Sequence, residues 1–225
     1  MSESLNQNAL SPIENPARLS RRGLLGKAAL TGLAAVPVVG MLTSSAEAAI
    51  QPLDASSREA FTDIRLHEND HVAFLKNALG RAARPKPSFK NLTTSSFAQF
   101  VELSRVLENV GVGAYLAAVP AIKSKEILSA AASIATIEAR HAGFLNVFAG
   151  RDVSLQALSN KPSAFDRPLT LQQVVGAATP YIASLNGGPA ASFTAGDDVS
   201  ILNFALLLEY LEAEYYNINV PRYIR

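Results

Sequence analysis

A glutamate and a histidine three residues apart occur twice in the chain, as Glu68-x-x-His71 and as Glu138-x-x-His141, and both copies continue with x-x-Phe-Leu. Residues three apart in a helix lie on one face, so each carboxylate points the same way as its imidazole. One such pair is a weak signal, because on a single helix it is typical of a solvated surface. Two matching pairs that face each other form a dinuclear metal site. The repeat therefore predicts a site for two metal ions.

Two more segments supply glutamates at a regular spacing. Glu108 precedes Tyr115 by seven residues, and Glu209 precedes Tyr216 by the same distance. The chain thus contains two kinds of segment, each present twice, which indicates an internal duplication and a pseudo-twofold axis through the site. Glu212 follows Glu209 by one helical turn and has two interpretations: an extra carboxylate that shifts with redox state, or a residue at the edge of the site.

The four glutamates of these segments lie on the apolar stripes of their predicted helices rather than on the polar faces. A buried ionised carboxylate is costly unless it is paired or binds a metal. The chain has no cysteine, so glutamate, aspartate and histidine must hold any metal, and this set suits iron, manganese or zinc. A polar core without metal is the alternative. Ordinary packing is the alternative role for Tyr115 and Tyr216.

Periodicity and stop signals predict four long helices joined by connections of unequal length. Ser56–Glu59 is a predicted capping box for the first helix, Asp197 or Asp198 is the predicted cap of the last, and a brief capped helix is expected near Thr170. The connection 81–95 is long enough to run the length of a bundle, so the second helix need not be antiparallel to the first. The short turn 121–124 makes the second and third helices an antiparallel hairpin. The predicted long helices are 56–79, 96–119, 125–149 and 199–217.

The composition suits a single domain with appendages. The chain has 225 residues, 48% apolar and 17% charged, with a net charge of +1. Residues 1–48 contain four of the 20 basic residues and three of the 19 acidic ones, which leaves 16 of each sign in the remainder. A neutral chain without a basic run has no electrostatic footprint for nucleic acid.

The first 48 residues resemble a twin-arginine export signal. Arg21-Arg22 precede small and aliphatic residues, an apolar run covers 28–42, and Ala46-Glu47-Ala48 has the small-x-small pattern of a cleavage site. The apolar run is shorter than the ~20 residues that span a membrane, so no stable span is expected after cleavage. We expect residues 1–48 to be the signal, residues 49–225 to be the mature domain, and the protein to be periplasmic or secreted.

Residues 55–220 resemble the ferritin-like domain of the desiccation-related proteins. The stretches that carry the resemblance are Ile201–Tyr216, Arg105–Tyr115 and Ile137–Leu145. In that family the helix with Leu-Asn-Phe-Ala and Leu-Glu-Tyr-Leu-Glu-Ala-Glu comes first, whereas here it comes last. The expected fold is therefore an all-α, ferritin-like four-helix bundle that is circularly permuted, with a long irregular connection before the last helix.

The resemblance also implies roles for the individual side chains. Glu68 and Glu138 would bridge two iron ions, for which manganese or a mixed iron–manganese pair is the alternative. His71 and His141 would each hold one metal, with Glu108 and Glu209 as terminal ligands and Glu212 as the ambiguous seventh member. Tyr115 and Tyr216 would hydrogen-bond the carboxylates and, with Glu68 and Glu138, take part in catalysis.

Two functions of different kinds follow from this resemblance. The first is an exported di-iron oxidoreductase that oxidises ferrous iron or removes peroxide or dioxygen during stress. The second is a non-enzymatic desiccation or stress-associated bundle, with a structural metal or an empty site. A ligand set indicates binding capacity but not turnover, and the fold does not decide between them. Assembly into a homo-oligomer stays open.

Overall fold

The structure, a computed structural model, describes residues 51–156 and 158–225, which all belong to one compact unit. It is an all-α bundle of four long helices with one short helix beside them. The predicted export signal lies outside the described residues. In the part of the chain that the structure describes, no helix is long and apolar enough to cross a membrane. The helices are α2 (Ala55–Leu79), α3 (Phe97–Ala118), α4 (Lys125–Phe148), α5 (Leu171–Ala178) and α6 (Asp198–Tyr223).

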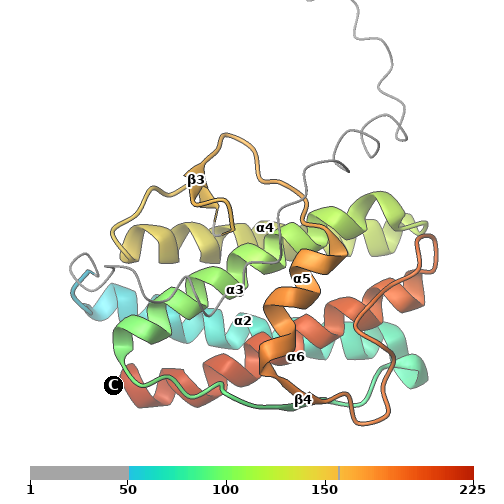
Figure 1. The fold of residues 1–225 in the computed structure, drawn as a ribbon, viewed down its shortest axis with the longest axis horizontal. Helices are drawn as coiled ribbons and strands as arrows, with labels where there is room; N and C mark the ends of the chain where they lie inside the picture. Colours follow the sequence, from blue (N-terminus) through green and yellow to red (C-terminus); the bar gives the residue numbers. More distant parts are fainter. Residues whose placement is uncertain (1–50, 157) are drawn as a thin grey trace, which may run out of the picture. The chain divides into compact units, whose positions relative to one another are not determined.

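The directions of the long helices follow from the lengths of their connections. Figure 1 shows that α2 and α3 run the same way, because the segment between them returns along the bundle, as the length of that segment allows. The short turn after α3 makes α3 and α4 an antiparallel pair. The connection between α2 and α3 pairs with the connection between α5 and α6 through two short antiparallel strands, β1 (Ser88–Phe89) and β4 (Ile182–Ser184). A second small hairpin joins β2 (Leu155–Gln156) and β3 (Lys161–Pro162).

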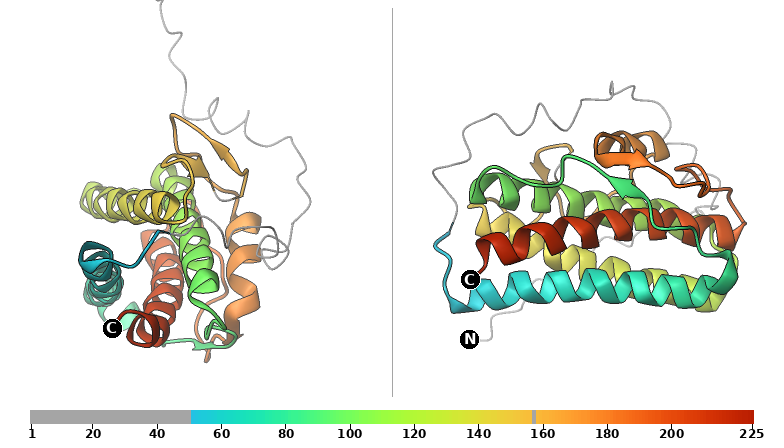
Figure 2. Two further views of the ribbon diagram at one scale, coloured as in Figure 1. Left: turned by 90° about the vertical axis from the view of Figure 1, so that its left-hand side faces the viewer. Right: turned by 90° about the horizontal axis from the view of Figure 1, so that it is seen from below.

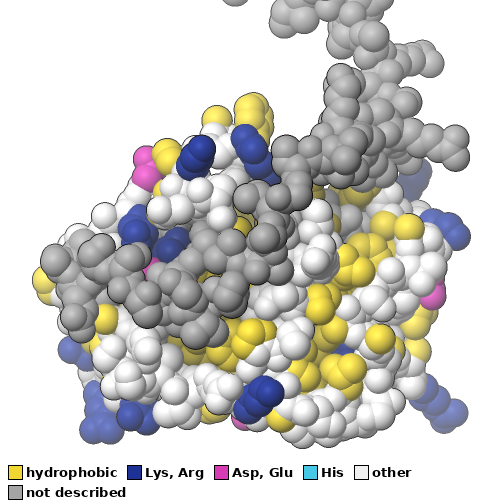
Figure 3. Space-filling view, in the orientation of Figure 1, with side chains coloured by type: hydrophobic (Ala, Val, Ile, Leu, Met, Phe, Trp, Pro, Cys, Tyr) yellow, Lys and Arg dark blue, Asp and Glu magenta, His cyan; other side chains and the backbone are white. Residues whose placement is uncertain are grey.

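The end-on view in Figure 2 places α2 and α4 on one side of the bundle and α5 on the other, outside α3. This arrangement explains the burial of the helices. The middle of α3 and most of α6 are enclosed on nearly all sides, whereas α2 and α4 bury a single stripe. On the face shown in Figure 3, the described Lys and Arg side chains are scattered, and no histidine is visible.

Two apolar clusters lie at different levels along α2 and α4. Phe61 and Ile64 belong to the first cluster, and Leu75 and Leu79 belong to the second. The first Glu-x-x-His pair lies on α2 between these two levels. The bundle therefore encloses its carboxylates between apolar layers, where water is largely excluded.

The helix ends correct two sequence predictions. Asp54, not Ser56, caps α2: its carboxylate accepts hydrogen bonds from the Ser57 amide at 2.8 Å and the Ser57 hydroxyl at 2.7 Å, so the predicted capping box is wrong. α6 continues through Pro221 to Tyr223, beyond the predicted end near residue 217. Pro221 has no amide hydrogen to donate to the carbonyl of residue 217, but the helix continues past it, and Tyr223 packs against Phe100 at 5.6 Å between ring centroids.

The periodicity of the first helix predicts an inward stripe that ends with Leu75 and Ala78, and the structure differs from it at this end. Ala78 is exposed and Leu79 is buried in its place, because Leu79 lies four residues after Leu75 and stays on the same face. The x-x-Phe-Leu ending of the repeat also predicts core packing for Phe74, but this side chain is 47% exposed. Its counterpart Phe144 is partly buried and packs against Phe61 at 5.5 Å between ring centroids. The caps predicted at Asp197 and Thr170 are both present, the latter as a full capping box.

Candidate metal centre

The four long helices bring six of the predicted ligands together. Their ligand atoms form two groups, within each of which all atoms lie within 4.8 Å of one another. Glu68 of α2 and Glu138 of α4 belong to both groups. A carboxylate shared by two groups is in the position of a bridging ligand, which is the arrangement that the resemblance implies for these two residues. The first group is Glu68, His71, Glu138 and Glu209, and the second is Glu68, Glu108, Glu138 and His141.

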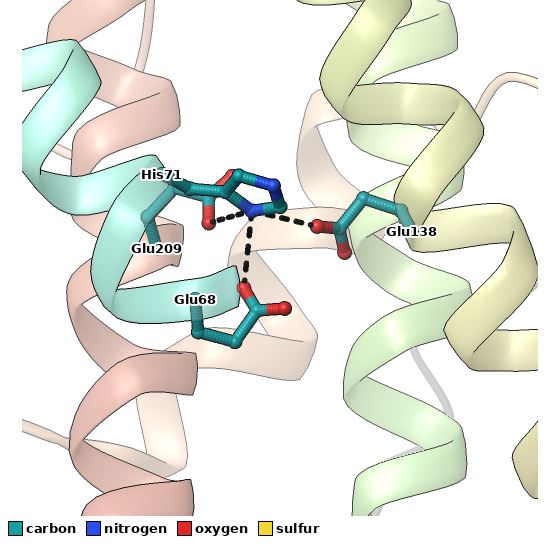
Figure 4. A group of neighbouring side chains, drawn as sticks. All are labelled: Glu68, His71, Glu138 and Glu209. Atoms are coloured by element: carbon teal, nitrogen blue, oxygen red, sulfur yellow. Dashed lines mark hydrogen bonds and ion pairs between the residues drawn. The ribbon is translucent and has the colours of Figure 1, made fainter. Parts of the chain in front are cut away.

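The first group surrounds the Nδ1 atom of His71. This nitrogen lies 3.2 Å from Glu209 Oε2, 3.3 Å from Glu138 Oε1 and 3.4 Å from Glu68 Oε2 (Figure 4). The three carboxylates come from three different helices. Nδ1 is therefore the ring atom of His71 that faces the metal position.

The second group surrounds the Nδ1 atom of His141 in the same way. This nitrogen lies 3.0 Å from Glu108 Oε2 and 3.1 Å from Glu68 Oε1. Glu108 comes from α3 and Glu209 from α6, so each terminal carboxylate is supplied by one of the two Glu-x6-Tyr helices. The two groups thus take equivalent ligands from the duplicated segments, although His71 Nδ1 has three carboxylates within 4 Å and His141 Nδ1 has two among the described residues.

Two buried tyrosines hold the outer oxygens of the terminal carboxylates. Tyr115 donates to Glu209 Oε1 at 2.5 Å, and Tyr216 donates to Glu108 Oε1 at 2.6 Å. Burial, followed by the charge of the nearby glutamate, raises the pKa of both tyrosines well above 10. Both hydroxyls therefore keep their protons and act as donors.

The shared carboxylates lack the hydrogen bonds that buried oxygens normally make. Glu68 and Glu138 are 0% exposed, and none of their four carboxylate oxygens has a partner in hydrogen-bond geometry among the described residues, although three of them lie 3.1–3.4 Å from Nδ1 of a histidine. Buried polar atoms are nearly always partnered, and those that are not require an explanation such as an ion. Two divalent cations between the carboxylates would satisfy all four oxygens. The donor set therefore fits a pair of metal ions.

Space for these carboxylates depends on Gly111. A Cβ atom at this position of α3 would lie 2.7 Å from Glu138 Oε2 and 3.4 Å from Glu212 Oε1, so a larger residue would displace Glu138. Glu212 is buried and close to this contact, but it belongs to neither group of ligand atoms. The structure thus places Glu212 beside the site, whereas the other six predicted ligands form the two groups that could hold a metal ion.

Without metal, the carboxylates compete for protons. Burial, and then the charge of Glu108, raise the pKa of Glu68 from 4.5 to about 7. Burial, and then neighbouring carboxylates, also raise the pKa values of Glu138 and Glu212 well above 4.5. Such shifts are the signature of acidic groups that are held together at a cost to folding.

The neighbouring carboxylates favour the charged form of the two histidines. Burial by itself lowers the pKa of His141, but the charge and hydrogen bond of Glu108 outweigh it and raise the value to about 11. Burial likewise opposes the charged form of His71, but its short contacts with the carboxylates of Glu138, Glu209 and Glu68 raise its pKa far above 6.5. In the metal-free site, protons on the histidines therefore balance part of the carboxylate charge.

His67 makes a contact that the sequence did not predict. The sequence gives it a position about 100° from Glu68, exposed or in an outer layer. In the structure it is half-buried, and its Nδ1 atom lies 3.0 Å from Nε2 of His141. The signal in the sequence was only that a third histidine directly precedes the first Glu-x-x-His pair.

The sequence pattern of the ferritin-like domain family matches residues 38–151, slightly more than half of the chain. The chain therefore belongs to the ferritin-like domain family. The matched residues include α2, α3 and α4, while α6, which supplies Glu209 and Tyr216, lies beyond them. No curated protein and no solved structure matches the chain.

Proposed function

We propose that the chain is an exported di-iron carboxylate oxidoreductase that oxidises ferrous iron with peroxide or dioxygen during stress. The observation that carries this proposal is the set of four buried carboxylate oxygens on Glu68 and Glu138 that make no hydrogen bond among the described residues and have only the two histidines beside them. When bound, a pair of iron ions supplies two electrons, one from each ion, which suffices to reduce hydrogen peroxide to water or dioxygen to peroxide.

The side chains of the site perform the remaining tasks. Glu68 and Glu138, which belong to both groups, would be shared between the two metal ions, and His71 and His141 would each hold one of them through Nδ1. The four carboxylates of the two groups together carry as much negative charge as two divalent cations carry positive charge. The hydroxyls of the two tyrosines hold the terminal carboxylates in place, as outer partners of metal ligands do.

The space beside the site favours a small substrate. A cavity of about 10 Å³ lies between α3, α5 and α6, and its lining includes Gly111 and Glu212 at the end that approaches the carboxylates. A volume of this size admits roughly one water-sized molecule. The rest of the lining is apolar: Leu107, Val110, Ala177, Ala178, Leu208 and Leu211. Dioxygen and peroxide, with two heavy atoms each, need only slightly more room than this, whereas an organic substrate is far too large for it.

The first experiment measures metal binding and turnover on the full chain. The chain is stripped of metal, loaded with Fe²⁺ without oxygen, and assayed for iron content and for ferrous oxidation after peroxide or air is added. We expect about two iron ions per chain, the count of a dinuclear carboxylate site. Glu138→Gln and His141→Ala should lose bound iron and oxidation together, while Glu214→Gln, whose carboxylate pairs with Lys86 outside the site, should behave like the parent.

Two outcomes would contradict this proposal. Two iron ions without oxidation would leave a structural metal site, which is the non-enzymatic stress-protein hypothesis. Trace iron that is the same in the parent and in the variants would show that there is no metal site.

The export part of the proposal rests on Arg21 and Arg22. Retention of an Arg21→Lys, Arg22→Lys chain in the cytoplasm, measured by cell fractionation, would support it.

The permuted helix order is also a proposal. It is supported by the ends of the described chain, since the side chain of Arg58, in the first turn of α2, donates a hydrogen bond to the carbonyl of Arg225. Neighbouring ends are what a circular permutation requires. The family match stops before α6, which is also what a displaced first helix would produce.

A further inference from the structure

The two halves of the site differ in what lies behind their histidines. The Nε2 atom of His141, which points away from the carboxylates, lies 3.0 Å from Nδ1 of His67. The planes of the two rings are within 6° of each other, with centroids 5.3 Å apart, so the nitrogens meet nearly in a common orientation. His67 belongs to α2 and His141 to α4, so this contact connects the two helices that carry the Glu-x-x-His pairs.

The other half of the site lacks this support. His67 directly precedes Glu68, whereas Ile137 directly precedes Glu138, and an isoleucine offers no ring nitrogen. Among the described residues, His71 makes hydrogen-bond contacts only through Nδ1, the atom that faces the carboxylates. Two ligand sets of identical composition therefore have different surroundings.

We propose that His67 is a positioning residue that makes the two metal positions unequal, with the position at His141 binding metal more tightly. This inference rests on the proposed function. When Nδ1 of a neutral histidine binds a metal, the proton of the ring is on Nε2. At His141 that N–H donates to Nδ1 of His67, which fixes both the tautomer and the orientation of the ligand ring.

The size of the effect follows from other metal sites. Removal of an outer hydrogen-bond partner typically costs about 10- to 100-fold in metal affinity. Because His67 contacts only one of the two ligand histidines, this loss should fall on one binding step alone. A purely structural contact between α2 and α4 would instead change folding stability and leave the two steps in the same ratio.

The test is a titration of the metal-free full chain with Co²⁺, followed by its visible absorption and by calorimetry. The parent should bind two ions in two resolved steps. In His67→Ala the tighter step should weaken by about 10- to 100-fold while the weaker step stays unchanged. His67→Gln, whose amide oxygen can accept the hydrogen bond, should recover part of the loss. Ile137→Ala, at the equivalent place of the repeat, is the matched control and should leave both steps as they are.

Several results would overturn the inference. Unchanged steps in His67→Ala, or equal weakening of both steps, would show that His67 does not distinguish the positions. Failure of His67→Gln to recover any affinity would remove the hydrogen bond as the cause. In each of these cases the uptake of two ions by the parent would leave the proposed function intact. A parent that takes up no metal would instead contradict the proposed function itself.

Discussion

Tyr216 donates a 2.6 Å hydrogen bond to Glu108, a residue on a different helix and 108 positions away in the chain. Tyr115 makes the equivalent bond to Glu209 at 2.5 Å. Each tyrosine thus holds the glutamate of the partner helix rather than the one on its own helix. In both carboxylates Oε1 accepts from the tyrosine and Oε2 faces a histidine. The crossed bonds therefore fix which oxygen is turned towards the site.

Replacement of Tyr216 by phenylalanine should destabilise the protein. The change leaves Glu108 Oε1 buried without its donor, and an unsatisfied buried acceptor costs about 1–3 kcal/mol, more when it is charged. The measurement is the free energy of unfolding of the metal-free chain in urea. Tyr181→Phe is the control, because Tyr181 is also buried but its hydroxyl makes no hydrogen bond among the described residues. Equal stabilities for the two variants would show that the crossed bond contributes nothing.

The metal-free protein should lose stability as the pH rises from 5 to 8. A carboxyl whose pKa is raised to about 7, as at Glu68, binds its proton more tightly in the folded chain than in the unfolded one. Its favourable contribution is therefore complete below about 4.5 and is lost as the pH rises through about 7. His141, with a pKa raised to about 11, has the same sign: its contribution is complete below about 6.5 and is lost towards pH 11.

Urea unfolding at a series of pH values, with and without metal, checks this prediction. Surface acids whose pKa values are lowered, such as Asp54 and Asp152, have already lost their protons by pH 5 and do not obscure the trend. Glu68→Gln should reduce the slope between pH 5 and 7. Metal competes with protons for the same ligands, so the stability gained from metal should grow as the pH rises. A metal-free protein that becomes more stable towards pH 8 would contradict the assigned shifts.

The spacing of residues predicted the helices and the inward position of the ligands because both depend on local periodicity. Glu68 and His71 lie on one face of any helix, and the burial of Phe61 and Leu75 on that same face determines where they point. The crossed tyrosine bonds and the contact of His67 could not be predicted, since they depend on how far one helix is shifted along another. Phe74 shows the same limit. It occupies the same position of the repeat as Phe144, but only Phe144 packs against Phe61, and Phe74 is exposed.

Replacement of Gly111 by alanine should weaken metal binding without unfolding the protein. The added methyl group would lie 2.7 Å from Glu138 Oε2, so the carboxylate must move away from its shared position. We expect a loss in metal affinity of at least about tenfold, as for other changes that displace a ligand. Gly176→Ala in α5 is the control: nothing lies within 4 Å of its added methyl group, and alanine should stabilise the helix by about 0.5–1 kcal/mol. Unchanged affinity in Gly111→Ala would show that Glu138 does not need its observed position.

Restoring the helix order that the resemblance implies should preserve the bundle and its metal content. In this permutant the chain begins at Gly188, continues through α6 to Arg225, and is joined to residue 51 by a flexible linker of about eight residues, which spans about 15 Å. The new ends lie in the exposed turn at Asn186–Gly187, where both residues have positive φ angles. Because Arg225 already contacts Arg58 and no helix is cut, α6 should keep its place beside α2, with helical content and metal per chain like those of the parent.

A chain opened inside α3, after Val110, is the control that should fail to fold. Failure of the first permutant as well would contradict the idea that the present order is a rearrangement of the same bundle.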